Sequence, residues 1–196
     1  PLIPVLQDPD SPKDVLNRLG STSEERLSKA PTNREKGFVR AAEAFAFTDG
    51  SLGDKRLAWM YAMQDLYNEF PDDQEVAAFY AVSMLSGATV SRDGRVLNNF
   101  LTESGTEITM QAGAIAMDLF RENPNHPGAA HYIIHSFDHP TYAPLALTAA
   151  EKYASIAPAV SHARHMPTHI FIQHGMWDRV SEWNNSAFQA GADLWE

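Results

Sequence analysis

Apolar residues recur at three- and four-residue intervals along most of the chain, which is the spacing of an amphipathic helix. In the segment 54–70, for example, Leu57, Met60 and Tyr67 hold these positions. Residues 76–85 are almost wholly apolar, as expected for a buried helix. No segment shows the two-residue alternation of a β-strand. The pattern therefore predicts an all-α protein.

Signals for helix starts and stops divide the chain into segments. A Ser or Thr followed three residues later by Glu is typical of a capping box, and this pattern occurs at 21–24, 32–35 and 104–107. The predicted helices cover residues 11–19, 21–29, 33–47, 54–70, 76–85, 108–122, 128–138, 143–156, 160–174 and 177–193. We predict an extended lead-in and short helices over 1–30, then helical repeats over 31–196 with a long loop at about 86–106, which is a candidate lid.

Three helix ends share a pattern of small or aromatic residues at four-residue intervals followed by proline. They read Met63-x3-Tyr67-x3-Pro71, Ala116-x3-Phe120-x3-Pro124 and Ala150-x3-Ala154-x3-Pro158. The last two prolines lie 34 residues apart, which is the tetratricopeptide period. The spacing predicts a tetratricopeptide-like solenoid of helical hairpins. A non-repetitive helical bundle is the alternative.

Histidine is confined to one quarter of the chain. All eight histidines lie between His126 and His174. Four of them form two pairs with four-residue spacing, which places both side chains of a pair on one face of a helix. The pairs are His131/His135 and His165/His169, offset by 34 residues. If they occupy equivalent positions in adjacent repeats, they lie on neighbouring helices whose axes are ~8–10 Å apart.

The two pairs predict a metal site, and Asp138 lies on the same stripe as the first pair. The predicted ligands are His131, His135, His165, His169 and Asp138, the last as a ligand or as a group that orients one. The chain has no cysteine, so only nitrogen and oxygen can bind the ion. These donors suit Zn²⁺, Cu²⁺, Fe²⁺, Mn²⁺ or Ni²⁺. A small polar ligand is the alternative occupant, and catalytic residues stay unassigned.

Two features favour simpler interpretations of the same residues. Buried neutral histidines with ordinary hydrogen bonds would also fit the packing between helices. Pro167 lies inside the second pair, and if it begins a helix, His165 leaves the stripe. Arg164 would then bind a substrate carboxylate or pair with Asp138. His126 precedes a proline and is expected to cap a helix; the remaining histidines lie outside the predicted ligand set.

Composition narrows the classes of function. The formal charge is −10, which argues against non-specific nucleic-acid binding. No run of 18 apolar residues suggests a membrane span. A chain without cysteine is compatible with the cytosol and with the periplasm, so a soluble protein is expected and its compartment stays open.

The histidine motifs resemble a family of bacterial tetratricopeptide-repeat proteins of uncharacterised activity. The similar segments are His126-Pro-Gly-Ala-Ala-His-Tyr-Ile-Ile-His-Ser-Phe-Asp138, His165-Met-Pro-Thr-His-Ile-Phe171, 31–36 and 67–73, within a resemblance that spans most of 10–190. The resemblance implies a helical-repeat fold and no catalytic assignment. Because family members are typically longer, with further repeats after the matching segment, this chain is expected to be an N-terminal or middle part.

Three functions are consistent with these observations. The first is a helical-repeat protein with a histidine-rich divalent-metal or polar-ligand site, for which metal-dependent hydrolysis or oxidation is the candidate chemistry. The second is a non-catalytic scaffold whose concave face binds a peptide or protein, with homo-oligomers or contacts to further repeats as related possibilities. The third is a pH-sensing histidine cluster.

Overall fold

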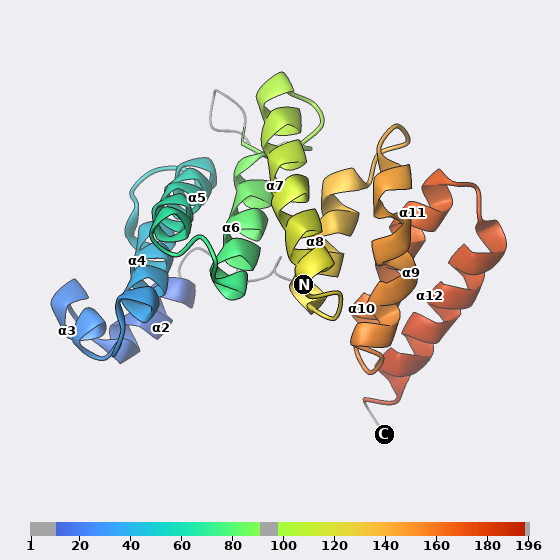
Figure 1. Cartoon of the computed structure of the whole chain (residues 1–196). Coiled ribbons are helices and arrows are strands. Elements are labelled where there is room, and N and C mark those ends of the chain that lie inside the picture. The colour runs from blue at the N-terminus through green and yellow to red at the C-terminus, as the bar shows by residue number, and fades with distance from the viewer. Residues whose placement is uncertain (1–10, 91–97, 195–196) are drawn as a thin grey trace. The chain divides into compact units, whose positions relative to one another are not determined.

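The computed structural model describes residues 11–90 and 98–194, and its regular secondary structure is helical. This confirms the predicted all-α class. The elements in chain order are α2 (Ser11–Leu19), α3 (Ser23–Ser28), α4 (Asn33–Phe47), α5 (Leu52–Glu69), α6 (Gln74–Gly87), α7 (Glu103–Glu122), α8 (Pro127–Phe137), the 3₁₀-helix η1 (Ala143–Ala146), α9 (Leu147–Ile156), α10 (Ser161–His165), α11 (Pro167–Gln173) and α12 (Trp177–Ala192) (Figure 1). Within the described ranges, none of these helices is both long and apolar enough to span a membrane.

The chain forms two compact units, unit 1 (Pro1–Thr109) and unit 2 (Met110–Glu196). The division lies within α7, far from residue 30. We predicted a change from an extended lead-in to helical repeats at residue 30. The division into two units does not test that change, which stays a prediction. The predicted metal ligands all belong to unit 2.

One predicted capping box is present as expected, and a second helix start is shifted by one residue from its prediction. Thr32 and Glu35 form a complete capping box at α4, as predicted. In α3 the cap is Thr22, one residue later than predicted, and its hydroxyl accepts a hydrogen bond from the Glu25 N–H. Glu25 reaches back instead to Ser21, whose N–H and hydroxyl both donate to its carboxylate. The segment therefore uses both hydroxyl residues, in different roles.

The predicted start of α7 at 104–107 is wrong. The helix begins at Glu103, and the hydroxyl of Thr102 accepts a hydrogen bond from the Gly105 N–H. The connection between α6 and α7 is consequently shorter than predicted, spanning 88–102. Part of the candidate lid, residues 91–97, lies outside the described residues.

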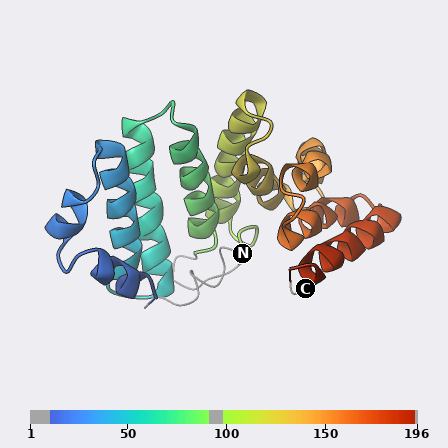
Figure 2. The ribbon, with the colours of Figure 1, turned by 90° about the horizontal axis from the view of Figure 1, so that it is seen from below.

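Unit 1 is built on three helices that lie side by side in alternating directions, α4, α5 and α6, with α2 and α3 against α4 (Figure 2). Its buried apolar residues include Ala41, Phe45, Met63, Leu66 and Val76. A Cβ at Gly37 would lie 2.2 Å from Leu66 Cδ1, so the absent side chain allows α4 and α5 to approach closely.

Unit 2 is packed around one apolar cluster, in which α9 contacts α8, α10 and α11, and α12 packs against α10 and α11. The cluster includes Ile133, Ile134, Phe137, Ile170 and Phe171. These apolar residues lie on α8 and α11, the helices that also carry His131, His135 and His169. Helix α11 also contacts α8 directly, and His169 on α11 lies at hydrogen-bond distance from Asp138, which follows α8.

Candidate metal centre

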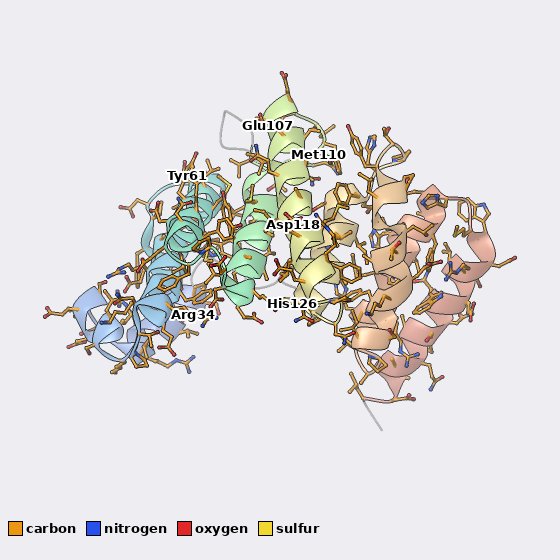
Figure 3. The ribbon with its side chains drawn as sticks, in the orientation of Figure 1. Arg34, Tyr61, Glu107, Met110, Asp118 and His126 are labelled. Carbon is orange, nitrogen blue, oxygen red and sulfur yellow. The ribbon has the colours of Figure 1, made fainter. Side chains whose placement is uncertain are left out.

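Helix α8 has strong local reasons to form where it does. The His126 Nδ1 atom accepts a hydrogen bond from the Ala129 N–H at 3.1 Å, which confirms His126 as the helix cap. Pro127 follows at the first helical position, where its missing N–H costs no helical hydrogen bond. Figure 3 labels His126 at the start of the helix. The apolar face of α8, with Ile133 and Ile134, is buried, so the orientation of its polar face is fixed.

Three histidines of unit 2 converge on one point. His131 and His135 extend from α8, and His162 extends from α10. The Nε2 atom of His131 lies 3.1 Å from Nε2 of His135 and 3.1 Å from Nε2 of His162. One ligand nitrogen from each of the three residues lies within 4.8 Å of the others. We call these residues the three-histidine group.

A second contact joins His165 and His169, whose Nε2 atoms lie 3.2 Å apart. Helix α10 ends at His165 and α11 begins at Pro167, so the break that the sequence suggested is present. It does not separate the pair. Met166, between the two helices, keeps a right-handed helical conformation, and the His169 N–H donates to its carbonyl oxygen. We call these two residues the histidine pair.

Each member of the histidine pair has an oxygen beside its other ring nitrogen. Asp138 Oδ2 lies 2.8 Å from His169 Nδ1, and Asn184 Oδ1 lies 2.8 Å from His165 Nδ1. The other Asp138 oxygen accepts a hydrogen bond from Gln173 Nε2 at 3.0 Å. Burial raises the pKa of Asp138, but the hydrogen bonds from His169 and Gln173 outweigh it, and the pKa is lower than usual. Asp138 is therefore an ionised acceptor at neutral pH.

The three-histidine group is held in its neutral form. Burial, reinforced by His135 and His162, lowers the pKa of His131 to about 2. Burial and then the neighbouring His169 lower the pKa of His135 to about 4, and burial lowers that of His162. His135 lies among many protein atoms yet keeps part of its surface in solvent. At pH 7 these imidazoles carry lone pairs and no charge, which is the state that binds metals.

A tyrosine ring covers one face of His131 in this group. The Tyr153 ring, from α9, stacks on His131 with centroids 5.3 Å apart and planes 16° apart. Tyr153 is buried, and burial raises the pKa of its hydroxyl to about 12. Tyr153 therefore stays a neutral phenol at physiological pH and restricts the orientation of the His131 ring.

The structure divides the predicted ligands into two neighbouring sets. His131 and His135 belong to the three-histidine group, His165 and His169 form the pair, and Asp138 supports the pair. His162 lies outside the predicted ligand set, although its three-residue spacing from His165 was an available signal. Gln173, one helical turn after His169, was not predicted either. Asn184 on α12 had no such local signal.

The suggested pairing of Arg164 with Asp138 is wrong. Arg164 donates hydrogen bonds to the carbonyl oxygen of Pro158 and to the hydroxyl of Ser186. Its guanidinium is used to join α10 to α12, and Asp138 is satisfied by His169 and Gln173.

Comparisons of the chain with protein-family models, with curated proteins and with solved structures found no match.

Proposed function

We propose that this chain is a tetratricopeptide-like helical-repeat protein of the family it resembles, and that unit 2 binds a divalent transition-metal ion. The ion binds to His131, His135 and His162. The successive contacts of α8 with α9 and of α11 with α12 are those of stacked hairpins, which supports the repeat architecture. The observation that carries the metal proposal is the convergence of three Nε2 atoms around His131.

The contact distances favour a shared ion. With metal–nitrogen bonds of about 2.0–2.1 Å, two ligand nitrogens 3.1 Å apart subtend an angle of about 100° at the ion. That angle lies between the values for octahedral and tetrahedral coordination. Both contacts of His131 therefore have the separation that two ligands of one ion adopt.

Hydrogen bonding alone does not account for these contacts. A neutral imidazole nitrogen has either one proton or one lone pair in the ring plane, so it makes one strong hydrogen bond. His131 Nε2 has two nitrogen neighbours at 3.1 Å. A metal ion satisfies all three nitrogens through their lone pairs, and the lowered pKa values of the group disfavour a proton in its place.

Three histidines leave a coordination position for water or substrate, as in catalytic zinc sites. Metal-assisted hydrolysis is therefore the reaction class that this ligand set serves best, with Zn²⁺ as the first ion to test. Oxidation at copper or iron is the second class, because imidazole also suits those metals. The absence of cysteine leaves no thiolate to select between them.

The test is the metal content of untagged protein purified without a metal column. We expect at least one equivalent of metal per chain by mass spectrometry, and a lower melting temperature after chelation. His131→Gln should abolish binding at this group. His174→Gln is the matched control, because the Nε2 atom of His174 has no hydrogen-bond partner within the described part of the chain. Metal-free protein that fails to take up Zn²⁺, Cu²⁺ or Fe²⁺ would overturn the proposal.

A second candidate function, an interaction scaffold, is favoured by a hollow in unit 1. The hollow has a volume of about 530 Å³ and lies among α4, α5 and α6. Its walls include Phe38, Trp59 and Phe79, and Arg34 lines it while bound to Asp73. The volume and the aromatic walls suit apolar side chains of an extended peptide. Phe79→Glu should then abolish the fluorescence change on adding tryptophan-free peptides with a phenylalanine anchor, while His135→Gln leaves it intact.

A further inference from the structure

The histidine pair presents a problem that its own hydrogen bonds create. The ionised Asp138 can only accept, so the nitrogen that faces it, His169 Nδ1, must carry a proton. The amide oxygen of Asn184 likewise accepts from His165 Nδ1. A neutral imidazole has one N–H, so the remaining nitrogens have none. Both Nε2 atoms therefore present lone pairs.

These two lone pairs face each other across 3.2 Å. Two acceptors at that distance repel unless a positively charged species lies between them. The species is a shared proton or a metal ion. With metal–nitrogen bonds of about 2.0–2.1 Å, the separation corresponds to an angle of about 100° at an ion, as in the three-histidine group.

The supporting residues resemble those that hold metal ligands elsewhere. A histidine that binds a metal through one nitrogen usually donates its other N–H to a carboxylate or carbonyl oxygen, which fixes the tautomer and the ring orientation. His169 has a carboxylate in this role, and His165 has an amide oxygen. Gln173 in turn orients Asp138. These contacts link Asp138, which follows α8, to residues of α11, and link α10 to α12.

We propose that His165 and His169 bind a second divalent cation through their Nε2 atoms, beside the ion of the three-histidine group. Asp138 and Asn184 are positioning residues that keep both Nε2 atoms unprotonated. This inference rests on the proposed metal binding of the neighbouring group, which makes unit 2 a two-cation site.

The two positions differ in the number of protein ligands, three against two, and so in expected affinity. The pair leaves at least two coordination positions for water or an oxygen-donor ligand. The two groups also lie close together, because the rings of His162 and His165 have centroids 6.5 Å apart. Two dications so placed repel each other. We therefore expect binding in two steps, with the pair filling second and more weakly.

The experiment is a Zn²⁺ titration of metal-free full-length chain, followed by calorimetry and by mass spectrometry after desalting. We expect two equivalents for the wild type, one for His169→Gln, and two for His174→Gln as the matched control. The remaining equivalent in His169→Gln should keep the affinity of the first step. Thermal unfolding of each metal-free variant shows whether it is folded.

Asp138→Asn provides a second, conservative variant. Asparagine offers one acceptor oxygen where two donors, His169 and Gln173, need one each. We expect the second step to weaken about 10–100-fold and the first step to stay unchanged, since loss of an orienting partner typically has that effect on metal affinity.

The outcomes separate this proposal from the first. One equivalent that survives in His169→Gln and is lost in His131→Gln would overturn the second position and leave the proposed function standing. One equivalent that is lost in both variants would indicate a single ion shared by the two groups. That result would also overturn the second position and leave metal binding by unit 2 standing. One equivalent lost only in His169→Gln would overturn the three-histidine site. No uptake would overturn both and leave a shared proton in the pair.

Discussion

Two polar networks, one in each unit, are satisfied in different ways. In unit 1, the Arg26 side chain is 6% exposed, and its guanidinium donates to Glu43 Oε1 at 2.6 Å and to the Gly20 carbonyl oxygen at 2.8 Å. Each of these donors meets an acceptor, and the charges are opposite. In unit 2, the ring nitrogens of five histidines meet other ring nitrogens at 3.1–3.2 Å.

This difference separates a polar network that serves the fold from one that needs an additional component. The histidines of unit 2 are half-buried, and ring nitrogens that face one another at hydrogen-bond distance call for an explanation. The Arg26 network is complete without a ligand at the contacts described. In the histidine cluster ring nitrogens face other ring nitrogens, and the proposed cations would complete these contacts.

The largest effect should come from breaking the complete network. Arg26→Met leaves Glu43 with its hydrogen bond from Ser23 but without its charged partner, in a largely buried position where side-chain exposure is 14%. We expect unfolding to become easier by about 3–5 kcal/mol, the usual cost of leaving one charge of a buried pair alone. Urea denaturation followed by circular dichroism measures it. Arg18→Met, at an exposed position, is the control, and an equal loss there would show that the effect is not specific to the network.

The next effect is a pH dependence that originates in unit 2. The unfolded-state pKa of histidine is 6.5, whereas the folded pKa is about 2 for His131 and about 4 for His135. Below pH 6.5 the unfolded chain binds protons that the folded chain does not, so stability is present above that pH and is lost as the pH falls. Between pH 7.5 and 5.5 the two residues together should cost metal-free protein about 2–3 kcal/mol.

Thermal unfolding in chelator at the two pH values measures this loss. For a chain of this size we expect the melting temperature to fall by roughly 5–10 °C. His131→Leu should remove about half of the difference, because it removes one of the two groups. A melting temperature that does not change would mean that the histidines are not held neutral in the folded state, and it would also exclude the pH-sensing alternative.

Much of the fold was accessible from the sequence because helices have local signals. Periodicity identified most of the described helices, and the Thr32–Glu35 box was located to the residue, but the segment predicted as one helix over 160–174 forms α10 and α11. The start of α7 was missed because several hydroxyl residues competed for one cap. A Cβ at Gly105 would lie 2.4 Å from the Asn99 carbonyl oxygen and 2.6 Å from that of Ala88. These contacts from other segments help to set the start of the helix, and a local pattern does not contain them.

The site was accessible in part for the same reason. The pairs with four-residue spacing make contact within their own helical segments, as in His131 with His135. Repeat register was a weaker guide, because His131 contacts His162, not its register equivalent His165. Helix axes separated by ~8–10 Å leave the meeting of individual nitrogens to side-chain rotation, which a 34-residue offset does not determine.

The smallest effect, and the sharpest test of the comparison, is His135→Leu in metal-free protein. Its imidazole is neutral at pH 7, and the ring nitrogen Nε2 faces another nitrogen. Replacing it with an apolar side chain of similar volume removes a poorly satisfied polar group. We expect the free energy of unfolding at pH 7.5 to change by less than about 1 kcal/mol, in the stabilising direction.

The metal dependence should change in the opposite sense. His135→Leu should lose the stabilisation that Zn²⁺ gives the wild type, since one of three ligands is missing. Ile133→Ala, on the buried face of the same helix, should cost about 2–5 kcal/mol and shows that α8 is sensitive to packing. If His135→Leu costs as much as Ile133→Ala, then His135 is a structural residue with a hydrogen bond of its own, like Arg26 in unit 1, and the difference between the two units disappears.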